Sequence, residues 1–272
     1  MPIIMAIITL LTDFGLNDEY VGTMKGVILS VNPFATIIDI THNIDPHDII
    51  QAAFTIKSSY KFFPEGSVHV VIVDPGVGGS RTIIAIEMAG HIFLAPDNGT
   101  LTLLFEEGDI ADIIRVDNKK FFLKSVSRTF HGRDIFAPVS AHISSGIKIN
   151  DIGTPINKNE LVKLSIPEPR ISDKGELVGT IVSIDHFGNL ITNIDSNCLK
   201  NFCRPEFRKK PEIKIANSKI SGLSESYENS SSNSPLIIVG SRGYLEIAIN
   251  CGSAKSYFKA EKGDTITVNL SD

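Results

Sequence analysis

One short loop of the sequence combines a carboxylate with a guanidinium, two groups that together can bind and orient a small polar molecule. Residues 73–81 read V-D-P-G-V-G-G-S-R and follow an apolar run, S-V-H-V-V-I-V, that is typical of a buried strand. Asp74 therefore falls at the C-terminal edge of a strand, where open α/β sheets place their ligands. Arg81 closes the loop, and the apolar run T-I-I-A-I-E-M returns the chain to the core. On this loop alone, a catalytic pair and an ion pair that only braces a turn are equally good interpretations.

Further polar turns carry residues of catalytic type. Asp13 follows the first apolar run, Asp97 and Asn98 follow the run H-I-F-L-A-P, and His131 lies in F-H-G-R-D directly before a predicted helix. If the sheet is parallel, Asp13 and Asp74 lie at the same edge of it. This expected convergence favours a catalytic role for Asp74 over a purely structural one.

The order of elements in the first half of the chain predicts how these turns are brought together. Residues 2–11 are an apolar run of the strand type, and apolar residues between 20 and 31 recur at helical spacing. We expect a strand at residues 35–41, a helix at 49–63, and then the strand that ends at the first loop. This βαβαβ order predicts a Rossmann-like α/β domain with a mostly parallel sheet and right-handed crossovers.

The pattern changes in the second half of the chain. Residues 165–176 are polar and contain two prolines, and beyond them short β-type runs alternate with Gly, Asn and Ser turns. We expect an N-terminal α/β catalytic domain at residues 1–166, a linker at 167–176, and a smaller C-terminal domain at 177–272. The second domain is predicted to be an antiparallel β-barrel, with a sandwich as the alternative. The serine-rich tract 221–235 is predicted to be a mobile loop without a function.

Two polar turns of the second domain carry groups of the binding type. In I-D-H-F-G-N-L-I-T-N-I, Asp185, Phe187 and Asn189 offer a partner for a cation, an aromatic face and an amide. Together these are the groups needed to hold a purine and an ammonium group. In G-S-R-G-Y-L-E-I-A-I-N, Ser241 and Arg242 can clamp a carboxylate. Each of these residues is also common in ordinary turns, so the residues alone leave both interpretations open.

Composition limits the classes of partner. The chain has 272 residues and a formal net charge of -5, and we see no basic stripe, which argues against nucleic-acid binding. Three cysteines without CxxC spacing predict neither a disulfide framework nor a zinc site, and they favour a reducing cytoplasm. The N-terminal apolar run is about ten residues long and lacks a basic leader, so we expect neither a signal peptide nor a membrane span.

The cluster of histidines and aspartates at residues 42–48 raises the question of a metal site. The residues that could ligate a divalent metal ion together with Asp13 are His42, Asp45, His47 and Asp48. The simpler interpretation is that Asp48 caps the following helix and that the histidines are structural. We therefore expect no metal ion.

Taken together, the motifs resemble those of one family. They are T-D-F-G-x-x-D-x-Y-V-G-x-M-K-G, V-D-P-G-V-G with Arg81, F-H-G-R-D, D-x-F-G-N-x-x-T-N and S-R-G-x-L-E-I-A. In this order, and with similar spacing over nearly the whole chain, they look like the motifs of the S-adenosyl-L-methionine (SAM) hydroxide adenosyltransferases. These proteins are relatives of the fluorinase and chlorinase that make 5′-halogenated adenosine.

The resemblance implies an activity, an assembly and a set of site residues. It implies hydrolysis of SAM to adenosine and L-methionine by attack of an activated water on the ribose C5′ carbon, without a cofactor. It implies a homotrimer with the substrate between the N-terminal domain of one subunit and the C-terminal domain of its neighbour. At the matching positions the catalytic triad would be Asp74, Arg81 and His131. The substrate-binding residues would be Asp13 at the ribose diol, Asn189 with Phe187 at the adenine, Asp185 at the methionine ammonium, and Ser241, Arg242 and Glu246 in the same pocket.

One departure from the halogenating relatives bears on the choice of nucleophile. Those enzymes resemble this chain but carry a tyrosine where Asp74 stands and lack the triad histidine, and a carboxylate there repels a halide. Gly132 stands where the fluorinase has its fluoride-binding serine, although the chlorinase also has glycine there. We therefore predict hydrolysis, with a chlorinase-like halogenase, a metal-dependent hydrolase and a non-catalytic adenosine or SAM binder as alternatives. The sequence does not decide whether Asp74 or His131 is the base.

Overall fold

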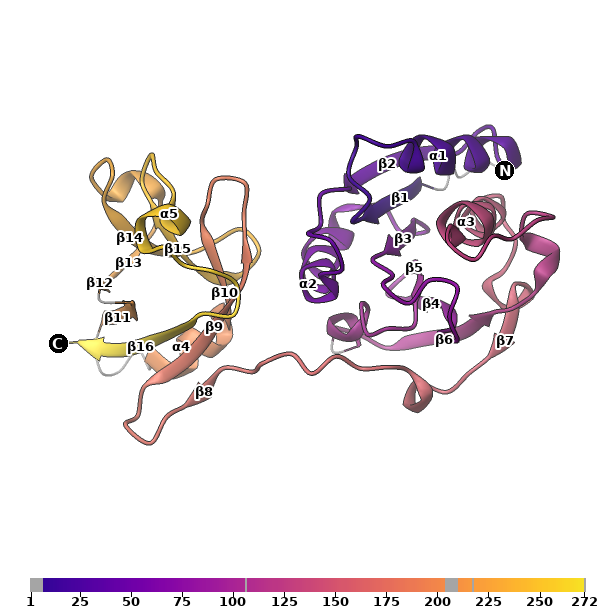
Figure 1. The fold of residues 1–272 in the computed structure, drawn as a ribbon. Helices are drawn as coiled ribbons and strands as arrows, with labels where there is room; N and C mark the ends of the chain where they lie inside the picture. The colour runs from indigo at the N-terminus through magenta and orange to yellow at the C-terminus, as the bar shows by residue number, and fades with distance from the viewer. Residues whose placement is uncertain (1–6, 106, 204–209, 217, 272) are drawn as a thin grey trace. The chain divides into compact units, whose positions relative to one another are not determined.

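The computed structural model describes residues 7–105, 107–203, 210–216 and 218–271. The chain divides into two compact units between Leu164 and Ser165, and each unit has a sheet and a hydrophobic core of its own (Figure 1). The stretch expected as a linker includes a short strand, β8 (Arg170–Ile171), which pairs with the sheet of the second unit. In the described part of the chain, no helix has the length and apolar character needed to span a bilayer.

The first unit contains a mixed, mostly parallel sheet with the strand order β2-β1-β3-β5-β4-β6-β7. Strands β2, β1, β3 and β5 pair in parallel, whereas β4 and β7 run against their neighbours. The predicted α/β class is confirmed. The elements are β1 (Ile7–Thr12), α1 (Tyr20–Val31), β2 (Thr36–Thr41), α2 (Ile49–Ser59), β3 (Val68–Ile72), β4 (Ile83–Met88), β5 (His91–Pro96), β6 (Ile110–Val116), α3 (Ala137–Ser144) and β7 (Gly153–Pro155). Residues 2–6 of the predicted first strand lie outside the described residues.

Helices cover both faces of this sheet because its central strands are apolar on both sides. In β1, Leu10 packs into the core on the side of α1 and α3, whereas Leu11 packs into the core on the side of α2. In β3, Val70 and Val71 divide between the same two cores. Successive side chains of a strand point to opposite faces, so this division follows from the apolar runs of the sequence. Figure 1 shows α1 and α3 on one side of the sheet and α2 on the other.

The helices of the first unit begin and end close to the predicted positions. Helix α1 spans Tyr20–Val31, and Pro33 follows it. Helix α2 begins after Asp48, whose Oδ1 accepts the backbone N–H of Gln51 at 2.8 Å, so the predicted cap is confirmed. The predicted helix at 49–63 continues past α2 only as a 3-10 turn, Tyr60–Phe62.

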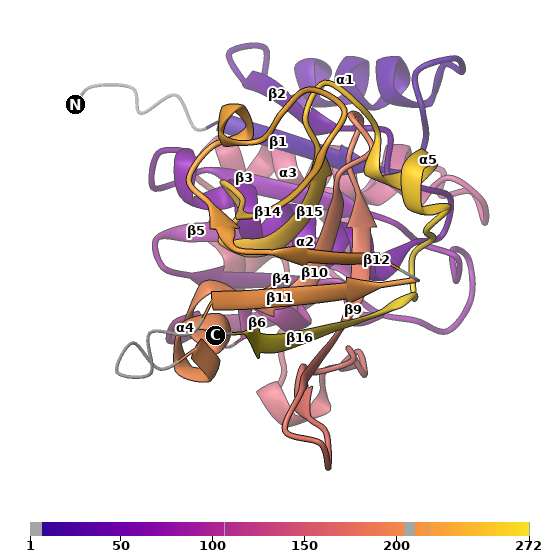
Figure 2. The same cartoon turned by 90° about the vertical axis from the view of Figure 1, so that its left-hand side faces the viewer.

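The second unit is an antiparallel sheet that nearly closes into a barrel, as predicted. Its strand order is β12-β11-β16-β9-β10-β15-β14-β13, and β12 also contacts β14 (Figure 2). Among the described strands of this unit, only β13 pairs in parallel, with β14. The remaining elements are β9 (Leu177–Ile184), β10 (Leu190–Asp195), α4 (Ser196–Cys203), β11 (Lys210–Ile215), β12 (Ser218–Ser221), β13 (Leu223–Ser224), β14 (Pro235–Val239), β15 (Tyr244–Ile249), α5 (Ala254–Phe258) and β16 (Thr265–Ser271).

The parallel part of the first sheet brings the polar turns to one edge. Strands β1 and β3 are parallel neighbours, so Asp13 after β1 and Asp74 after β3 lie at the same end of the sheet. Strand β5 pairs with β3 on its other side and ends just before Asp97. His131 immediately precedes a π-helical turn (Gly132–Phe136) that leads into α3, and α3 packs against β1 and β3. The fold therefore places the turn with Asp13, the loop with Asp74 and the helix start with His131 at the same edge of the first sheet.

Candidate active site

The loop at residues 73–81 is held at its start by a hydrogen bond from a side chain and in its middle by close packing on another backbone segment. The side-chain amide of Asn98 donates to the carbonyl of Val73 at 2.8 Å and fixes the end of the strand before Asp74. Gly78 has φ +75, and a Cβ there would lie 2.0 Å from the carbonyl oxygen of Arg128. Only glycine allows both this backbone conformation and this close approach. The loop is thus packed against the segment that leads to His131.

Asp74, Arg81 and His131 form one continuous hydrogen-bonded group. Arg81 Nε lies 3.0 and 2.9 Å from the two carboxylate oxygens of Asp74, and Arg81 Nη2 also bonds Asp74 Oδ2. The same Nη2 lies 2.8 Å from His131 Nδ1. The Asp74 and Arg81 side chains are 5% and 12% exposed, so water screens this ion pair weakly. The structure brings the three predicted catalytic residues together.

The surroundings of His131 keep its ring neutral. Burial lowers the pKa of His131 below the ordinary value of 6.5, and the positive charge of Arg81 lowers it further. The carboxylates of Asp74 and Asp134 oppose this shift but do not overcome it. The contact with Arg81 also requires a neutral ring. A guanidinium has only donors, so the ring nitrogen that faces it must be an acceptor, which a protonated imidazole does not offer.

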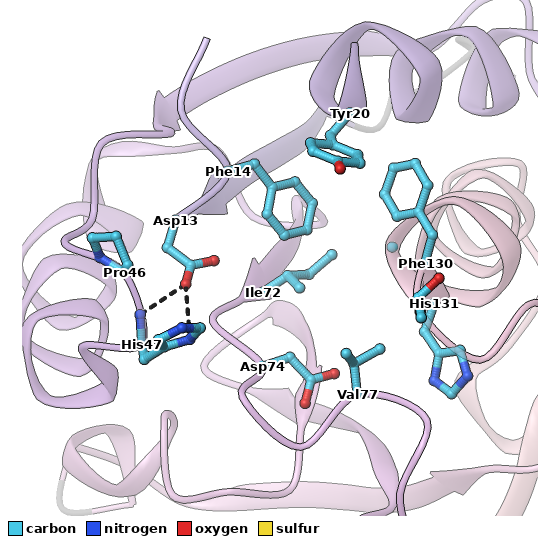
Figure 3. Close-up of a pocket in the computed structure, with 12 residues that line it drawn as sticks. Asp13, Phe14, Tyr20, Pro46, His47, Ile72, Asp74, Val77, Phe130 and His131 are labelled. Carbon is cyan, nitrogen blue, oxygen red and sulfur yellow. Dashed lines mark hydrogen bonds and ion pairs between the residues drawn. The ribbon is translucent and has the colours of Figure 1, made fainter. Parts of the chain in front are cut away.

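Asp13 shares a pocket of about 280 Å³ with Asp74 and His131. Its Oδ2 accepts the backbone N–H of His47 at 2.9 Å, and the His47 ring lies 4.0 Å from the same oxygen (Figure 3). His47 has φ +67, an uncommon conformation for a residue with a side chain. Asp13 therefore presents a carboxylate, anchored on one side, to the space in front of the triad.

Three aromatic rings form an apolar side of this pocket. Phe14, Tyr20 and Phe130 pack edge-on or tilted, with ring centroids 5.1 to 6.1 Å apart. Figure 3 shows these rings together on one side, with the polar ends of Asp13 and Asp74 below them. Gly132 lies against the rings, because a Cβ there would be 3.3 Å from Phe14 and 3.2 Å from Phe130. The rings of Phe14 and Phe130 leave no room for a side chain larger than that of glycine at position 132 unless they shift.

The second unit has a separate pocket of about 650 Å³ that contains the other predicted binding residues. Asp185 Oδ1 accepts the backbone N–H groups of Phe187 and Asn189 at 2.9 and 2.8 Å, and its Oδ2 accepts the Asn189 amide at 2.9 Å. Gly188, with φ +84, completes the turn. Asp185 therefore orients the Asn189 amide, while the Phe187 ring stays 73% exposed.

Glu246 is the buried charge of this pocket. Its side chain packs so closely on Gly240 that a Cβ there would lie 1.8 Å from Glu246 Oε1. Burial raises the pKa of Glu246 and the Asp185 charge raises it further, whereas hydrogen bonding to Tyr227 and the charge of Arg242 lower it. Ser241 and Arg242 are exposed at the mouth of the pocket. The predicted binding residues thus fall into two groups, Asp13 with the triad and the remainder with Glu246.

Several residues of the sequence analysis have structural roles instead. Asp97 Oδ1 accepts the backbone N–H of Val162 at 2.9 Å, so this turn anchors the chain at the end of the first unit. His42 Nδ1 bonds Thr12 Oγ1 at 2.8 Å, and Asp48 caps α2. Within the described residues, no group of three or more His, Cys, Asp or Glu side chains gathers as metal ligands would.

Sequence reasoning missed Tyr227, and its account of the tract around that residue was wrong. The tract at 221–235, predicted to be a loop without a function, contains β13 and a 3-10 turn, Tyr227–Asn229. The Tyr227 hydroxyl donates to Glu246 Oε2 at 3.2 Å inside the second pocket. No local motif marks this residue, because the serine-rich sequence around it has no periodicity. An aromatic residue in an otherwise polar tract was the available signal.

The fold and the site define an α/β enzyme with a carboxylate–guanidinium–imidazole centre at the carboxyl edge of its sheet. Family models described as the SAM hydroxide adenosyltransferase N-terminal and C-terminal domains match residues 8–153 and 179–267. The chain belongs to this family.

Relatives over the full length support the assignment. An (R)-S-adenosyl-L-methionine hydrolase of Methanocaldococcus jannaschii is 36% identical, with 97% of this chain and 96% of the relative covered. A fluorinase of Actinoplanes sp. is 28% identical, with 96% and 97% covered. A crystal structure of an uncharacterized conserved protein from Thermotoga maritima superposes with a TM-score of 0.88 at 34% identity, covering 96% of this chain and 99% of that one.

Proposed function

We propose that this protein hydrolyses SAM to adenosine and L-methionine, and that Asp74, Arg81 and His131 carry the reaction. A water oxygen forms a bond to the ribose C5′ carbon, the bond from C5′ to the sulfonium sulfur breaks and leaves its electron pair on sulfur, and the water gives its proton to a base of the triad. Methionine leaves as a neutral thioether, so the leaving group needs no acid. The observation that carries this proposal is the Arg81 guanidinium, which links the Asp74 carboxylate to the His131 ring, two side chains that line the first pocket.

The pocket of the first unit suits a reaction in which opposite charges cancel. Water on its own is a weak nucleophile at neutral pH, and a positioned base contributes roughly 10²- to 10⁴-fold. The rings of Phe14, Tyr20 and Phe130 exclude water from one side, which favours attack by an anionic oxygen on a sulfonium-bearing carbon. Asp13, anchored by His47, is proposed to bind the ribose diol beside the triad.

The pocket of the second unit suits the two ends of SAM that do not react. Asn189, oriented by Asp185, can hydrogen-bond the adenine edge, and the exposed Phe187 ring can pack beside it. Asp185 also supplies the negative charge for the methionine ammonium. The remaining groups proposed for the methionine end are Ser241, Arg242 and Glu246.

A homotrimer with substrate between neighbouring subunits is part of the proposal. It is supported by the division of the site residues, because the first unit holds the reactive groups and the second unit holds those for adenine and methionine. Each complete site would then need two chains. A cytoplasmic location is also proposed, on the odd number of cysteines in the sequence.

Mixed trimers test the shared site. Asp74→Ala subunits and Arg242→Ala subunits, co-expressed and purified through two different tags, would each be nearly inactive alone at low SAM. If the site is shared, a mixed trimer contains sites built from two unaltered halves and regains activity. If each chain holds a whole site, the mixed trimer is no more active than its parents, and light scattering shows independently whether three chains associate.

Product analysis tests the reaction itself. Pure protein incubated with SAM should release adenosine and methionine in equal amounts, and Asp74→Ala and His131→Ala should lower the rate by about 10²-fold or more with assembly unchanged. Release of 5′-chloro-5′-deoxyadenosine in chloride would identify a halogenase, and loss of activity in chelator would identify a metal-dependent hydrolase. Intact SAM after long incubation would identify a binding protein.

The sulfonium of SAM is a stereocentre, which adds a finer expectation. The Methanocaldococcus jannaschii and Salinispora tropica relatives are named (R)-S-adenosyl-L-methionine hydrolases. We infer the same preference here, because one fixed pocket for the methionine arm can place only one epimer with C5′ in front of the triad. Separate incubation of the two epimers, followed by measurement of adenosine, distinguishes preference from indifference.

A further inference from the structure

The last two residues of the F-H-G-R-D motif have no place in the proposed chemistry, yet Asp134 is a fully buried charged side chain close to the triad. Its side chain is 0% exposed, whereas the Arg133 side chain that pairs with it is 37% exposed. Arg133 Nε donates to Asp134 Oδ1 at 2.6 Å, and the guanidinium lies over the Phe130 ring. A buried carboxylate is expensive to retain unless it holds something in place.

Asp134 organises the segment that precedes His131. Its Oδ2 accepts the backbone N–H of Ser127 at 2.7 Å, and its backbone carbonyl accepts the N–H of Leu123 at 2.9 Å. Ser127 in turn accepts the N–H of Phe130 on its hydroxyl at 3.0 Å. The segment 123–130 is therefore tied to Asp134 at two points, its backbone carbonyl and its carboxylate. It ends at Phe130, the residue directly before His131.

The charge of Asp134 persists in this environment and acts on His131. Burial works to raise the pKa of Asp134, but hydrogen bonds from Arg133 and Ser127 outweigh it, and the pKa lies below its ordinary value. The negative charge of Asp134 and hydrogen bonding with the Ser127 backbone both raise the pKa of His131. The charge of Asp74 also raises the pKa of His131. Burial of the ring and the positive charge of Arg81 lower it.

We propose that Asp134 is a positioning residue for hydrolysis: it holds the 127–130 segment and thereby fixes the His131 ring against Arg81. The inference rests on the proposed function, because it concerns the orientation of one member of the triad. Asp134 lies outside the lining of the pocket and touches no reacting group. A shift of the ring by about 1 Å is enough to cost roughly 10²-fold in rate.

The competing interpretation is that Asp134 only stabilises the fold. Both interpretations expect Asp134→Asn to unfold at a lower temperature. Only the positioning role predicts that kcat falls by about 10- to 100-fold. The KM for SAM should then change less than about twofold, because the substrate contacts are intact. On either interpretation the His131 ring should titrate at lower pH in the variant, because the removed charge is one that raises its pKa. Only the positioning role also predicts altered NMR shifts of the neutral ring.

The experiment compares Asp134→Asn with Arg133→Gln and Ser127→Ala as full-length proteins. Arg133→Gln removes the ion pair but keeps the carboxylate and its bond to Ser127, so kcat should stay within about threefold of wild type. Ser127→Ala removes the hydroxyl that accepts from Phe130 and that also hydrogen-bonds the Asp134 carboxylate, so kcat should fall by a few-fold and in the same direction. The ring of His131 is followed by NMR in histidine-labelled protein, which reads its titration without reference to activity.

The proposal is overturned if Asp134→Asn folds and keeps both the wild-type kcat and the wild-type NMR shifts of the neutral His131 ring. It is also overturned if kcat falls only in proportion to the fraction unfolded. If Asp134→Asn does not fold, unchanged kcat and ring shifts in Ser127→Ala reject it instead. A wild-type protein that releases no adenosine would reject the proposed function, while the NMR shifts of the neutral ring in the variants would still report whether Asp134 orients His131.

Discussion

Nη2 of Arg81 lies 2.8 Å from Nδ1 of His131, and this contact fixes the proton on the imidazole. A guanidinium has no acceptor, so Nδ1 must accept, and a neutral ring then carries its proton on Nε2. In this arrangement the Nδ1 lone pair is already in use. We propose that Asp74 is the base, because its carboxylate has lone pairs beyond those that Arg81 uses, and that His131 holds Arg81 in place.

The first prediction concerns pH. Protonation of His131 would set an N–H against the Arg81 guanidinium and break the triad, so activity requires the neutral ring. Because burial and Arg81 lower the pKa of His131, the neutral form persists below the ordinary value of 6.5. We expect the acid limb of kcat for SAM hydrolysis to lie below pH 6.5 and the rate to be flat from there to neutral pH. A rate profile with its midpoint at or above 6.5 would contradict the assignment.

The second prediction concerns the loop that carries Asp74. In Gly78→Ala the added methyl would meet the Arg128 carbonyl at 2.0 Å, and the φ of +75 is unfavourable for alanine. We expect a loss of about 1–3 kcal/mol in stability and a kcat at least about tenfold lower, because the loop must move away from His131. Thermal unfolding and turnover measure the two effects.

Gly26→Ala is the matched control for that substitution. Gly26 lies inside α1, and a Cβ there has no neighbour within 4 Å. Alanine should therefore stabilise the helix by about 0.5–1 kcal/mol and leave kcat unchanged. Equal losses in the two variants would mean that the Gly78 contact with Arg128 has no special part in the site.

Sequence reasoning was strongest where periodicity and parallel topology act together. The run before Asp74 predicts a buried strand, and the βαβ order predicts that its end meets the end of β1, so the meeting of Asp13 and Asp74 could be foreseen. The polar turns also pointed to His131, and the family resemblance placed it in the triad, although it approaches from a helix start far along the chain. Nothing in local sequence gives the 2.8 Å contact between His131 and Arg81, because it depends on how α3 packs on the sheet.

The residues that were missed are held by tertiary contacts alone. Tyr227 reaches Glu246 from a tract whose composition predicts irregular structure, because the 3-10 turn there depends on a capping box between Ser226 and Asn229. Asp134 was visible in the F-H-G-R-D motif, but its partners Ser127 and Leu123 are brought to it by the fold. Propensity and pattern carry no information about such contacts.

The third prediction concerns substrate binding in the second pocket. Tyr227→Phe removes the hydroxyl that donates to Glu246, leaving a buried carboxyl with one donor fewer. We expect the KM for SAM to rise about tenfold with kcat changed less than twofold, because a hydrogen bond to a charged group is lost before and during the reaction alike. Tyr257→Phe is the control, since Tyr257 is 56% exposed and lies outside the pocket lining. A fall in kcat at unchanged KM would instead assign Tyr227 to the chemical step.

The fourth prediction concerns stability rather than activity. His69 is fully buried in β3, where its Nδ1 bonds Thr9 Oγ1 at 2.8 Å, its Nε2 bonds His91 Nδ1 at 3.1 Å, and its ring stacks on Phe93. Burial, and to a smaller extent the charge of His91, lower the pKa of His69 to about 3. The unfolded chain takes up this proton near pH 6.5 whereas the folded chain does not, so stability is lost as pH falls below 6.5.

His69→Gln isolates this contribution because glutamine does not titrate. Between pH 6.5 and 5, where most carboxylates are still ionised, the free energy of unfolding of the wild type should fall more steeply than that of His69→Gln, by up to about 1.4 kcal/mol per pH unit. Denaturant unfolding of the two proteins across this range measures the difference in slope. Parallel slopes would show that the folded protein accepts the proton at His69, which the buried hydrogen bonds to Thr9 and His91 should not allow.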